Sequence, residues 1–241
     1  MNINNENKRY PVVPMRDVII FPQTIIPLLV GRDASKEAVE RALNEDRKIL
    51  CVSQKSFVES DEDPKAKDIY RVGTICNIIQ DLKLPDGTIR LLVEGEKRVK
   101  VEKFVRTANC LLAEIYFSDK KLPKNTIELE ALLRAFKKKF KLYINLNKSI
   151  PNSANIPIEE DVKVEEFLYS VLANMQAEIG KKQKIFELDS VEESIKILYR
   201  FVMEEIEILH LENKIDSTVK HKLNKMQRDY YLTEQLDAIN K

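Results

Sequence analysis

Apolar residues in the first half of the chain recur at every second position, most clearly between residues 72 and 105. Ile89, Leu91 and Val93 alternate with Arg90, Leu92 and Glu94, and residues 74–81 show the same period. This alternation is typical of half-buried strands. The two runs are separated by Leu-Pro-Asp-Gly, in which proline presets φ and glycine supplies the left-handed residue of a type I turn with a bulge. The pattern therefore predicts a hairpin.

Shorter alternating runs surround this hairpin. Residues 99–102 and 111–117 each predict another strand, and residues 35–44 carry the apolar stripe of a helix that leads into a strand at 48–54. Several short antiparallel strands joined by loops are typical of a barrel or a folded sheet. We therefore expect the first half to be a β-rich lobe with one helix.

The hydrophobic period changes to 3.6 after a polar stretch that ends at Pro123, which predicts a domain boundary there. One helix begins at Asn125, a second runs from about Glu159 to Gly180, and a short one covers residues 182–188. Gly180 is a residue type that commonly follows a helix end. The second half is predicted to be helical.

Residues 191–241 contain no glycine or proline and predict one long helix, with Ser190 and Glu193 as its capping box. Its apolar face is wide at first and then narrows to a coiled-coil-like stripe, which needs a partner. The side chains expected to mediate assembly are Leu223, Met226, Tyr230, Leu236 and Ile239. The pattern runs to the last residue without a cap, so we expect the chain to be part of a longer protein.

Charge and composition exclude several classes of function. The 241 residues are 44% hydrophobic and 33% charged, and 40 basic against 39 acidic side chains leave a net charge of +1. A dedicated nucleic-acid or anionic-membrane surface normally shows a clustered basic excess, so we expect neither nucleic acid nor a membrane as a partner. The Lys-rich run at 137–141 fits a solvated helix face better than a binding site.

The residues that commonly hold metals or disulfides are few. Cys51, Cys76 and Cys110 have no CxxC spacing and favour buried, reduced thiols in a cytoplasmic protein. His210 and His221 are too far apart on one helix to share a metal ion. We expect no metal, no cofactor and no catalytic residue in this chain.

Several stretches of the sequence resemble one known family. Residues 14–22, Pro-Met-Arg-Asp-Val-Ile-Ile-Phe-Pro, and residues 26–32, Ile-Pro-Leu-Leu-Val-Gly-Arg, are similar to the opening of the Lon proteases. Residues 68–74, 84–95, 184–191 and 226–232 follow in the order and spacing of that family. The resemblance covers nearly the whole chain, although no single stretch is a catalytic signature.

The resemblance implies an α+β fold: a PUA-like β lobe at residues 9–117, a helical lobe at 124–210, and a long projecting C-terminal helix. Residues 211–241 would continue that helix toward an AAA+ ATPase that this chain lacks. ATP and Mg²⁺ would bind that missing ATPase, since Gly180-Lys181, the only Gly-Lys pair, has neither the upstream glycine nor the following hydroxyl residue of a phosphate loop. The Ser-Lys proteolytic dyad would also lie outside the chain.

The function implied by the resemblance is substrate recognition and assembly for an ATP-dependent serine protease. The partners would be unfolded or degron-bearing proteins, the rest of the protease, and neighbouring subunits of a homo-oligomer, a hexamer in the full-length family. The alternative from another class is a free-standing, Lon-like adaptor without a protease.

Capture of unfolded chains needs apolar surface that is left uncovered. The candidates are apolar and proline residues in the stretch at 22–27 and at the hairpin end, with charged residues at the start of the first helix nearby. Packing in the core or in a turn is the competing interpretation for each. The full set is Pro22, Ile25, Pro27, Arg32, Asp33, Glu37, Leu82, Leu84 and Pro85.

Overall fold

The computed structural model describes residues 8–55, 64–118, 120–121, 126–147, 150 and 162–239. Side chains at 126, 233, 234 and 236–239 are outside this description. The chain forms two compact units: Met1–Leu133 with Asn155–Leu198, and Arg134–Ala154 with Tyr199–Lys241. The predicted acidic loop at residues 59–63, the cap at Asn125 and the helix start near Glu159 lie outside the described residues.

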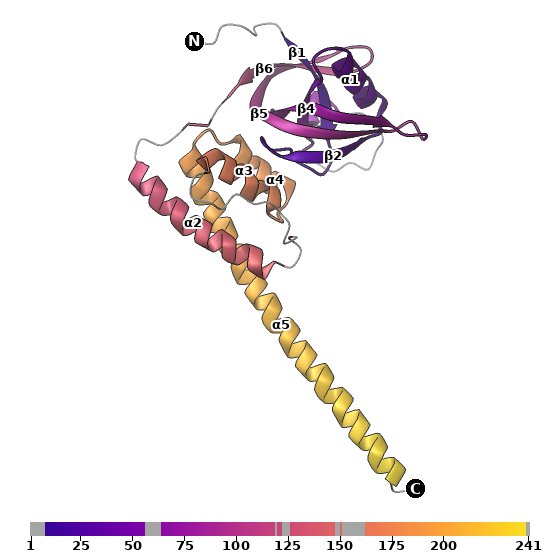
Figure 1. Ribbon diagram of the computed structural model, residues 1–241, viewed down its shortest axis with the longest axis vertical. Helices are drawn as coiled ribbons and strands as arrows, with labels where there is room; N and C mark the ends of the chain where they lie inside the picture. The colour runs from indigo at the N-terminus through magenta and orange to yellow at the C-terminus, as the bar shows by residue number, and fades with distance from the viewer. Residues whose placement is uncertain are drawn as a thin grey trace. The chain divides into compact units, whose positions relative to one another are not determined.

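A mixed six-stranded sheet forms the body of the first unit (Figure 1). Its order is β2-β5-β4-β3-β1-β6, and a further pairing of β5 with β6 closes five of the strands into a ring. Only β1 and β3 run parallel to each other; every other pairing is antiparallel. The strands are β1 Arg9–Met15, β2 Ile25–Val30, β3 Lys48–Ser53, β4 Val72–Lys83, β5 Ile89–Arg106 and β6 Leu111–Phe117.

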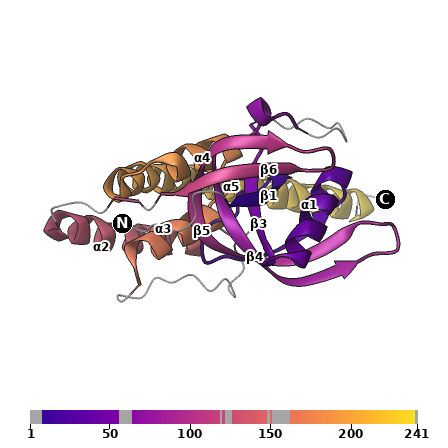
Figure 2. The same cartoon turned by 90° about the horizontal axis from the view of Figure 1, so that it is seen from above.

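Strand β5 is 18 residues long and serves two parts of the sheet. Its first part pairs with β2 and its last part with β6, while β4 pairs along most of its length. The sequence pattern predicted two separate strands here, and this was wrong. Bulges after Ile75, Ile78 and Val101 let the ladder bend without ending. Figure 2 shows the resulting curvature of the strands around one another.

The helix α1, Asp33–Asn44, covers one face of the sheet against β1, β3 and β6. Its Ala38, Val39 and Ala42 are buried in a core cluster with residues of β3, β4 and β5. A second cluster includes Tyr10, Leu50 and Val99. Strand β3 contributes to both clusters, which explains why its sequence is almost continuously apolar.

The first unit also contains α3, Val164–Asn174, α4, Ile179–Glu187, and the start of α5. Phe21, between β1 and β2, packs edge-on against Phe186 of α4 at 5.2 Å and stacks with Tyr169 of α3 at 6.3 Å. These ring contacts join the two helices to the β strands.

The predicted helix end at Gly180 was wrong. Helix α3 ends at Asn174, where the side-chain Nδ2 donates to Ser170 O and the chain turns extended at Met175. Gly180 lies inside α4, whose first turn is closed by bonds from Lys181 and Lys182 to Glu178 O. The side-chain bond from Asn174 satisfies a carbonyl near the helix end without a left-handed glycine.

The second unit consists mainly of the later parts of two helices, α2, Thr126–Leu146, and α5, Val191–Ile239, which is 49 residues long. Phe136 of α2 meets Tyr199 of α5 edge-on at 5.7 Å, and Phe140 stacks with Tyr143 at 5.8 Å. The prediction of one long helix is confirmed. At its start, Glu193 N–H donates to Ser190 Oγ at 3.3 Å, as the capping box predicted.

Candidate functional site

An apolar face is formed by side chains of β2, β5 and β4 that point away from the core. In the register of the strands, Leu29 lies opposite Arg90, which lies opposite Leu82. The next row is Pro27, Leu92 and Gln80, and the last is Ile25, Glu94 and Asn77. We call these three rows, with the bulged Ile79, the outer face.

The apolar residues of the outer face are exposed except Leu92, which is half-buried. Leu29 is 67% exposed, Ile25 59% and Leu82 55%, whereas the alternate residues Leu28 and Leu91 are buried in the core. Exposed large apolar side chains are ordinary when scattered, but a contiguous group marks a surface that meets a partner. The outer face is such a group.

Strand β2 is the edge of the sheet, since among the described strands it pairs with β5 alone. Gly95 N–H donates to Thr24 O at 2.9 Å, so by antiparallel alternation Ile26, Leu28 and Val30 bond to β5. The backbone of Ile25, Pro27 and Leu29 therefore faces the open edge. Proline has no N–H, and this interrupts the row of donors to which another strand could add.

The loop before β2 fixes the place of this strand. Gln23 has a positive φ of 63° and its N–H donates to Gly95 O, while Thr24 Oγ1 donates to Phe21 O at 2.6 Å. A Cβ on Gly95 would lie well inside van der Waals contact with Phe21 O, so only glycine allows the loop to approach β5 so closely. Pro22 is buried in this loop and is not part of the outer face.

The hairpin between β4 and β5 ends in the predicted turn. Gly87 has φ of 80° and its N–H donates to Leu84 O at 3.0 Å. The Asp86 carboxylate accepts from Thr88 N–H at 2.9 Å, and this bond lowers the pKa of Asp86. Leu84 is half-buried and Pro85 exposed, so the turn offers one apolar ring beyond Leu82.

The three predicted polar residues lie around the start of α1. Arg32 and Asp33 line a cleft of about 490 Å³ that also includes Leu29 of the outer face and Asp17. Glu37 lines a neighbouring cleft of about 380 Å³ together with Asp33. The hydrogen bond from Lys36 lowers the pKa of Asp33, which therefore carries its charge at neutral pH.

The structure thus brings Ile25, Pro27 and Leu82 onto one face, although they are far apart in sequence. Sequence reasoning missed Leu29, Arg90, Leu92 and Glu94. Leu29 could have been found, since it follows Ile25 and Pro27 at the two-residue period of the strand. The β5 residues needed the register, which sequence alone does not provide.

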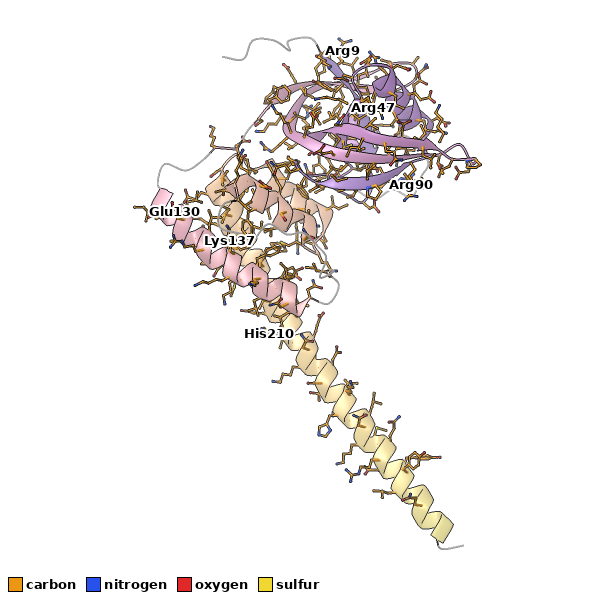
Figure 3. All side chains as sticks on the ribbon, viewed as in Figure 1. Arg9, Arg47, Arg90, Glu130, Lys137 and His210 are labelled. Atoms are coloured by element: carbon orange, nitrogen blue, oxygen red, sulfur yellow. The ribbon has the colours of Figure 1, made fainter. Side chains whose placement is uncertain are left out.

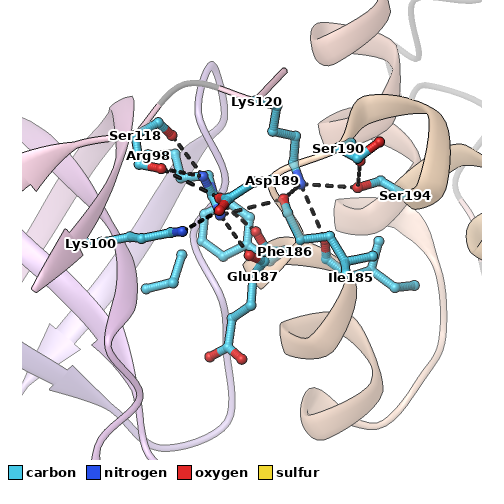
Figure 4. Close-up of polar contacts among 12 residues, drawn as sticks. Arg98, Lys100, Ser118, Lys120, Ile185, Phe186, Glu187, Asp189, Ser190 and Ser194 are labelled. Carbon is cyan, nitrogen blue, oxygen red and sulfur yellow. Dashed lines mark hydrogen bonds and ion pairs between the residues drawn. The ribbon is translucent and has the colours of Figure 1, made fainter. Parts of the chain in front are cut away.

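A buried polar junction joins β5 to the end of α4 within the first unit (Figure 4). Arg98 Nε donates to Phe186 O at 2.9 Å, Nη2 to Glu187 O at 2.8 Å and Nη1 to Ser118 O at 2.7 Å. Cationic side chains at a helix C-terminus satisfy its unpaired carbonyls and favour its dipole. Arg98 therefore acts as the cap that holds α4 against the sheet.

Two lysines complete this junction. Lys120 Nζ donates to Ile185 O, to Leu188 O and to Ser194 Oγ, and Lys100 Nζ pairs with Asp189 Oδ2 at 2.5 Å. Burial, together with the charge of Arg98, lowers the pKa of the Lys120 ammonium group to about 7. The hydrogen bond from Lys100 lowers the pKa of Asp189. Each of these groups has a structural partner within the junction.

A second apolar surface is a stripe along α5. It comprises seven exposed side chains spaced three or four residues apart: Ile208, Leu211, Ile215, Val219, Leu223, Met226 and Tyr230. Three of the five predicted assembly residues belong to this stripe or its end. The side chains of Leu236 and Ile239 lie outside the described residues.

The described residues contain no group of three or more His, Cys, Asp or Glu side chains placed to hold a metal ion. Cys51, Cys76 and Cys110 are buried free thiols. No helix in the described ranges is long and apolar enough to cross a membrane.

Comparison with known families gives one match over most of the chain. The ATP-dependent protease La (LON) substrate-binding domain matches residues 9–204. The Lon protease of Azospirillum brasilense is 40% identical over 232 residues, which is 96% of this chain and 28% of that protein. The Lon protease of Rhizobium meliloti is 38% identical over 242 residues, 98% of this chain and 29% of that protein. The chain spans less than a third of the length of these relatives.

Solved structures show the same fold. The N-terminal domain of a Mycobacterium avium complex Lon protease has a TM-score of 0.65 at 18% identity, covering 81% of this chain and 98% of that one. A Lon N-terminal domain protein from Xanthomonas campestris has a TM-score of 0.54 at 14% identity, covering 80% and 97%. At these identities the likeness concerns the fold alone.

Proposed function

Because the chain belongs to the family of Lon protease substrate-binding domains, we propose that its outer face binds exposed apolar segments of unfolded or degron-bearing proteins. The observation that carries this proposal is the set of exposed apolar side chains on β2 and β4, with the half-buried Leu92 of β5 between them. They stand on paired strands, so the surface is preformed and loses little entropy when a partner binds.

Side-chain contact suits a binding surface that must accept many sequences. Each half-exposed Leu or Ile recovers roughly 1 kcal/mol when it is covered, and this gain depends on apolar area rather than on a particular neighbour. Addition of a substrate strand to β2 is less favourable, because Pro27 removes a donor from the open edge. Binding would therefore be weak for each segment and tolerant of sequence.

The polar residues near this face would contribute polar contacts to the bound segment. Arg32 and Asp33 border the cleft that includes Leu29, and Glu37 borders the neighbouring cleft that shares Asp33. Leu84 and Pro85 extend the apolar surface toward the hairpin turn. Pro22 would act only through its position in the loop that supports β2. The binding residues of the proposal are thus a subset of those predicted from sequence, with Leu29 and Leu92 added.

The domain itself would bind without chemistry. In the proposal, ATP hydrolysis with Mg²⁺ and peptide cleavage belong to the rest of a longer, cytoplasmic protease, and buried free thiols suit such a reducing compartment. Residues 9–117 and 124–210 would form the recognition lobes, and 211–241 the connection to the ATPase ring. The exposed stripe of α5 supports a role in assembly with neighbouring subunits, a hexamer in the full protein.

The proposal is tested by charged substitutions on the outer face. We expect Ile25→Glu and Leu82→Glu each to weaken binding of a reduced, carboxymethylated, permanently unfolded test protein several-fold, measured by fluorescence anisotropy. Their melting temperatures should stay near wild type, because both side chains are exposed. Tyr116→Glu, at an exposed position on β6, serves as an apolar-to-charged control. Unchanged binding by both outer-face variants would contradict the proposal.

A further inference from the structure

Two charged side chains interrupt the outer face. Arg90 and Glu94 lie on β5, the central strand of the three, with Leu92 between them on the same side. Both side chains are exposed, and neither side chain forms a hydrogen bond or ion pair with any residue in the described part of the chain. Figure 3 labels Arg90 at the outer surface of the strands.

Several charged side chains near this face form ion pairs. Lys48 binds Glu96, Arg47 binds Asp81 and Lys83 binds Glu40. Arg90 instead lies between Leu29 and Leu82, while Glu94 lies between Ile25 and Asn77. A charge flanked by apolar side chains becomes partly desolvated when a partner covers the face, so a complementary charge on the partner gains more there than in open solvent.

The spacing of the two charges matches an extended chain. Residues i and i+4 of a strand lie on one side and are about 13 Å apart. An extended polypeptide laid along β5 repeats this spacing, so its side chains at i, i+2 and i+4 can face Arg90, Leu92 and Glu94 together. Because the contacts come from side chains, the peptide can lie in either chain direction.

We infer that Arg90 and Glu94 determine specificity in substrate binding: the outer face prefers an extended segment with an apolar residue midway between an acidic and a basic residue four positions apart. Arg90 receives the acidic side chain, Glu94 the basic one, and Leu92 with Pro27 and Leu29 the apolar one. This inference rests on the proposed function and adds the charge pattern of its substrates.

The test uses capped peptides of the pattern Leu-Thr-Asp-Thr-Leu-Thr-Lys-Thr-Leu and variants with two Asp, two Lys or two Ser at the charged positions. Kd is measured by titration of backbone amide shifts, which also locates the contact. An exposed ion pair contributes up to about 1 kcal/mol, so the Asp/Lys peptide should bind about fivefold more tightly than either like-charged peptide. At about 1 M salt the preference should vanish while apolar binding persists.

Charge reversal supplies the sharper readout, since it should change the preference rather than abolish binding. Arg90→Glu should prefer the Lys/Lys peptide and Glu94→Arg the Asp/Asp peptide, and the double reversal should again prefer Asp/Lys. Glu102→Arg and Lys103→Glu, exposed on the later part of β5, are matched controls that should keep the wild-type preference.

The outcomes separate this inference from the proposed function. Equal Kd values for all four peptides, with amide shifts on β2 and β5 and no change on reversal, would overturn the charge preference and leave apolar capture standing. Amide shifts confined to other strands, with binding unaffected by Leu29→Glu, would overturn both.

Discussion

At the scale of single residues, Gly95 shows how one missing side chain supports the outer face. Its lack of a Cβ lets the loop at Phe21 lie against β5 and positions the start of β2. Phe21 in turn contacts the rings of α3 and α4. The position of the strand edge and the attachment of the helices therefore depend on the same close approach.

We expect Gly95→Ala to destabilise the protein by about 2 kcal/mol, because a methyl group must displace the backbone at Phe21. Urea denaturation followed by circular dichroism measures this loss. Gly31→Ala is a suitable control, since a Cβ there meets only ordinary contact with Thr88 at 3.8 Å. Equal free energies of unfolding for the two variants would show that the loop at Phe21 can shift without loss of stability.

Lys120 gives the free energy of unfolding a pH dependence that can be measured separately from that of other groups. Its pKa is lowered to about 7 from an ordinary 10.5, so between these values the unfolded chain holds a proton that the folded chain has released. Stability therefore rises with pH in this window, by up to about 1.4 kcal/mol per unit. The charges of Asp189 and Glu165 oppose this shift, since both raise the Lys120 pKa.

The measurement compares the free energy of unfolding of wild type and Lys120→Met between about pH 7.5 and 9.5. The contributions of titratable groups that both proteins share cancel in the difference. The wild type should therefore gain stability relative to the variant as pH rises. A constant difference would mean that the acceptors at Ile185, Leu188 and Ser194 keep Lys120 protonated.

Some residue roles could be predicted and others could not. Ser190 was predicted as the cap of the long helix because capping depends on residues three apart, and Glu193 N–H does donate to it. Arg98 and Lys120 were missed, since the acceptors that hold them include backbone carbonyls 65 to 90 residues away. A long-range contact with backbone leaves no pattern of residue types in the sequence.

At the scale of elements, β2 combines an apolar outer side with a protected edge. Its outward side chains can meet a partner, while Pro27 interrupts the donors of the backbone. The strand can therefore stay exposed while pairing with another strand is disfavoured.

Restoring the missing backbone N–H at position 27 should allow strands of other molecules to pair with this edge. We expect Pro27→Val to increase aggregation at high protein concentration, seen as thioflavin fluorescence and light scattering, because β2 then offers an uninterrupted edge. Ile25→Val, which adds no donor, should behave as wild type. Aggregation of Pro27→Val no faster than this control would contradict the role of the proline.

Most elements were predictable because each has a local signal. The hairpin, α1, the two-residue period of the strands and the single long α5 all follow from patterns within the element, and the α+β fold class is confirmed by structures of Lon N-terminal domains. The continuous β5 and the end of α3 were mispredicted, since a bulge and a side-chain bond at Asn174 replaced the expected turn and glycine. The resemblance to Lon is confirmed by the family match. The domain boundaries and the binding residues stay predictions.

At the scale of the whole molecule, the stripe on α5 predicts self-association. The apparent mass from light scattering should rise with protein concentration and stay low for Leu223→Glu with Met226→Glu, because these changes place charges in an apolar seam. His221→Glu, on the opposite side of the helix, is the control. Equal association of both variants would place the contact elsewhere.

The central claim is that the outer face contacts unfolded protein. It is tested most directly by a photo-crosslinking amino acid placed at position 29, 82 or 102 and exposed to a permanently unfolded test protein or its native form. We predict adducts at 29 and 82 with the unfolded form, few with the native form, and few at 102 with either. Equal adducts at all three positions, or none at 29 and 82, would contradict the account.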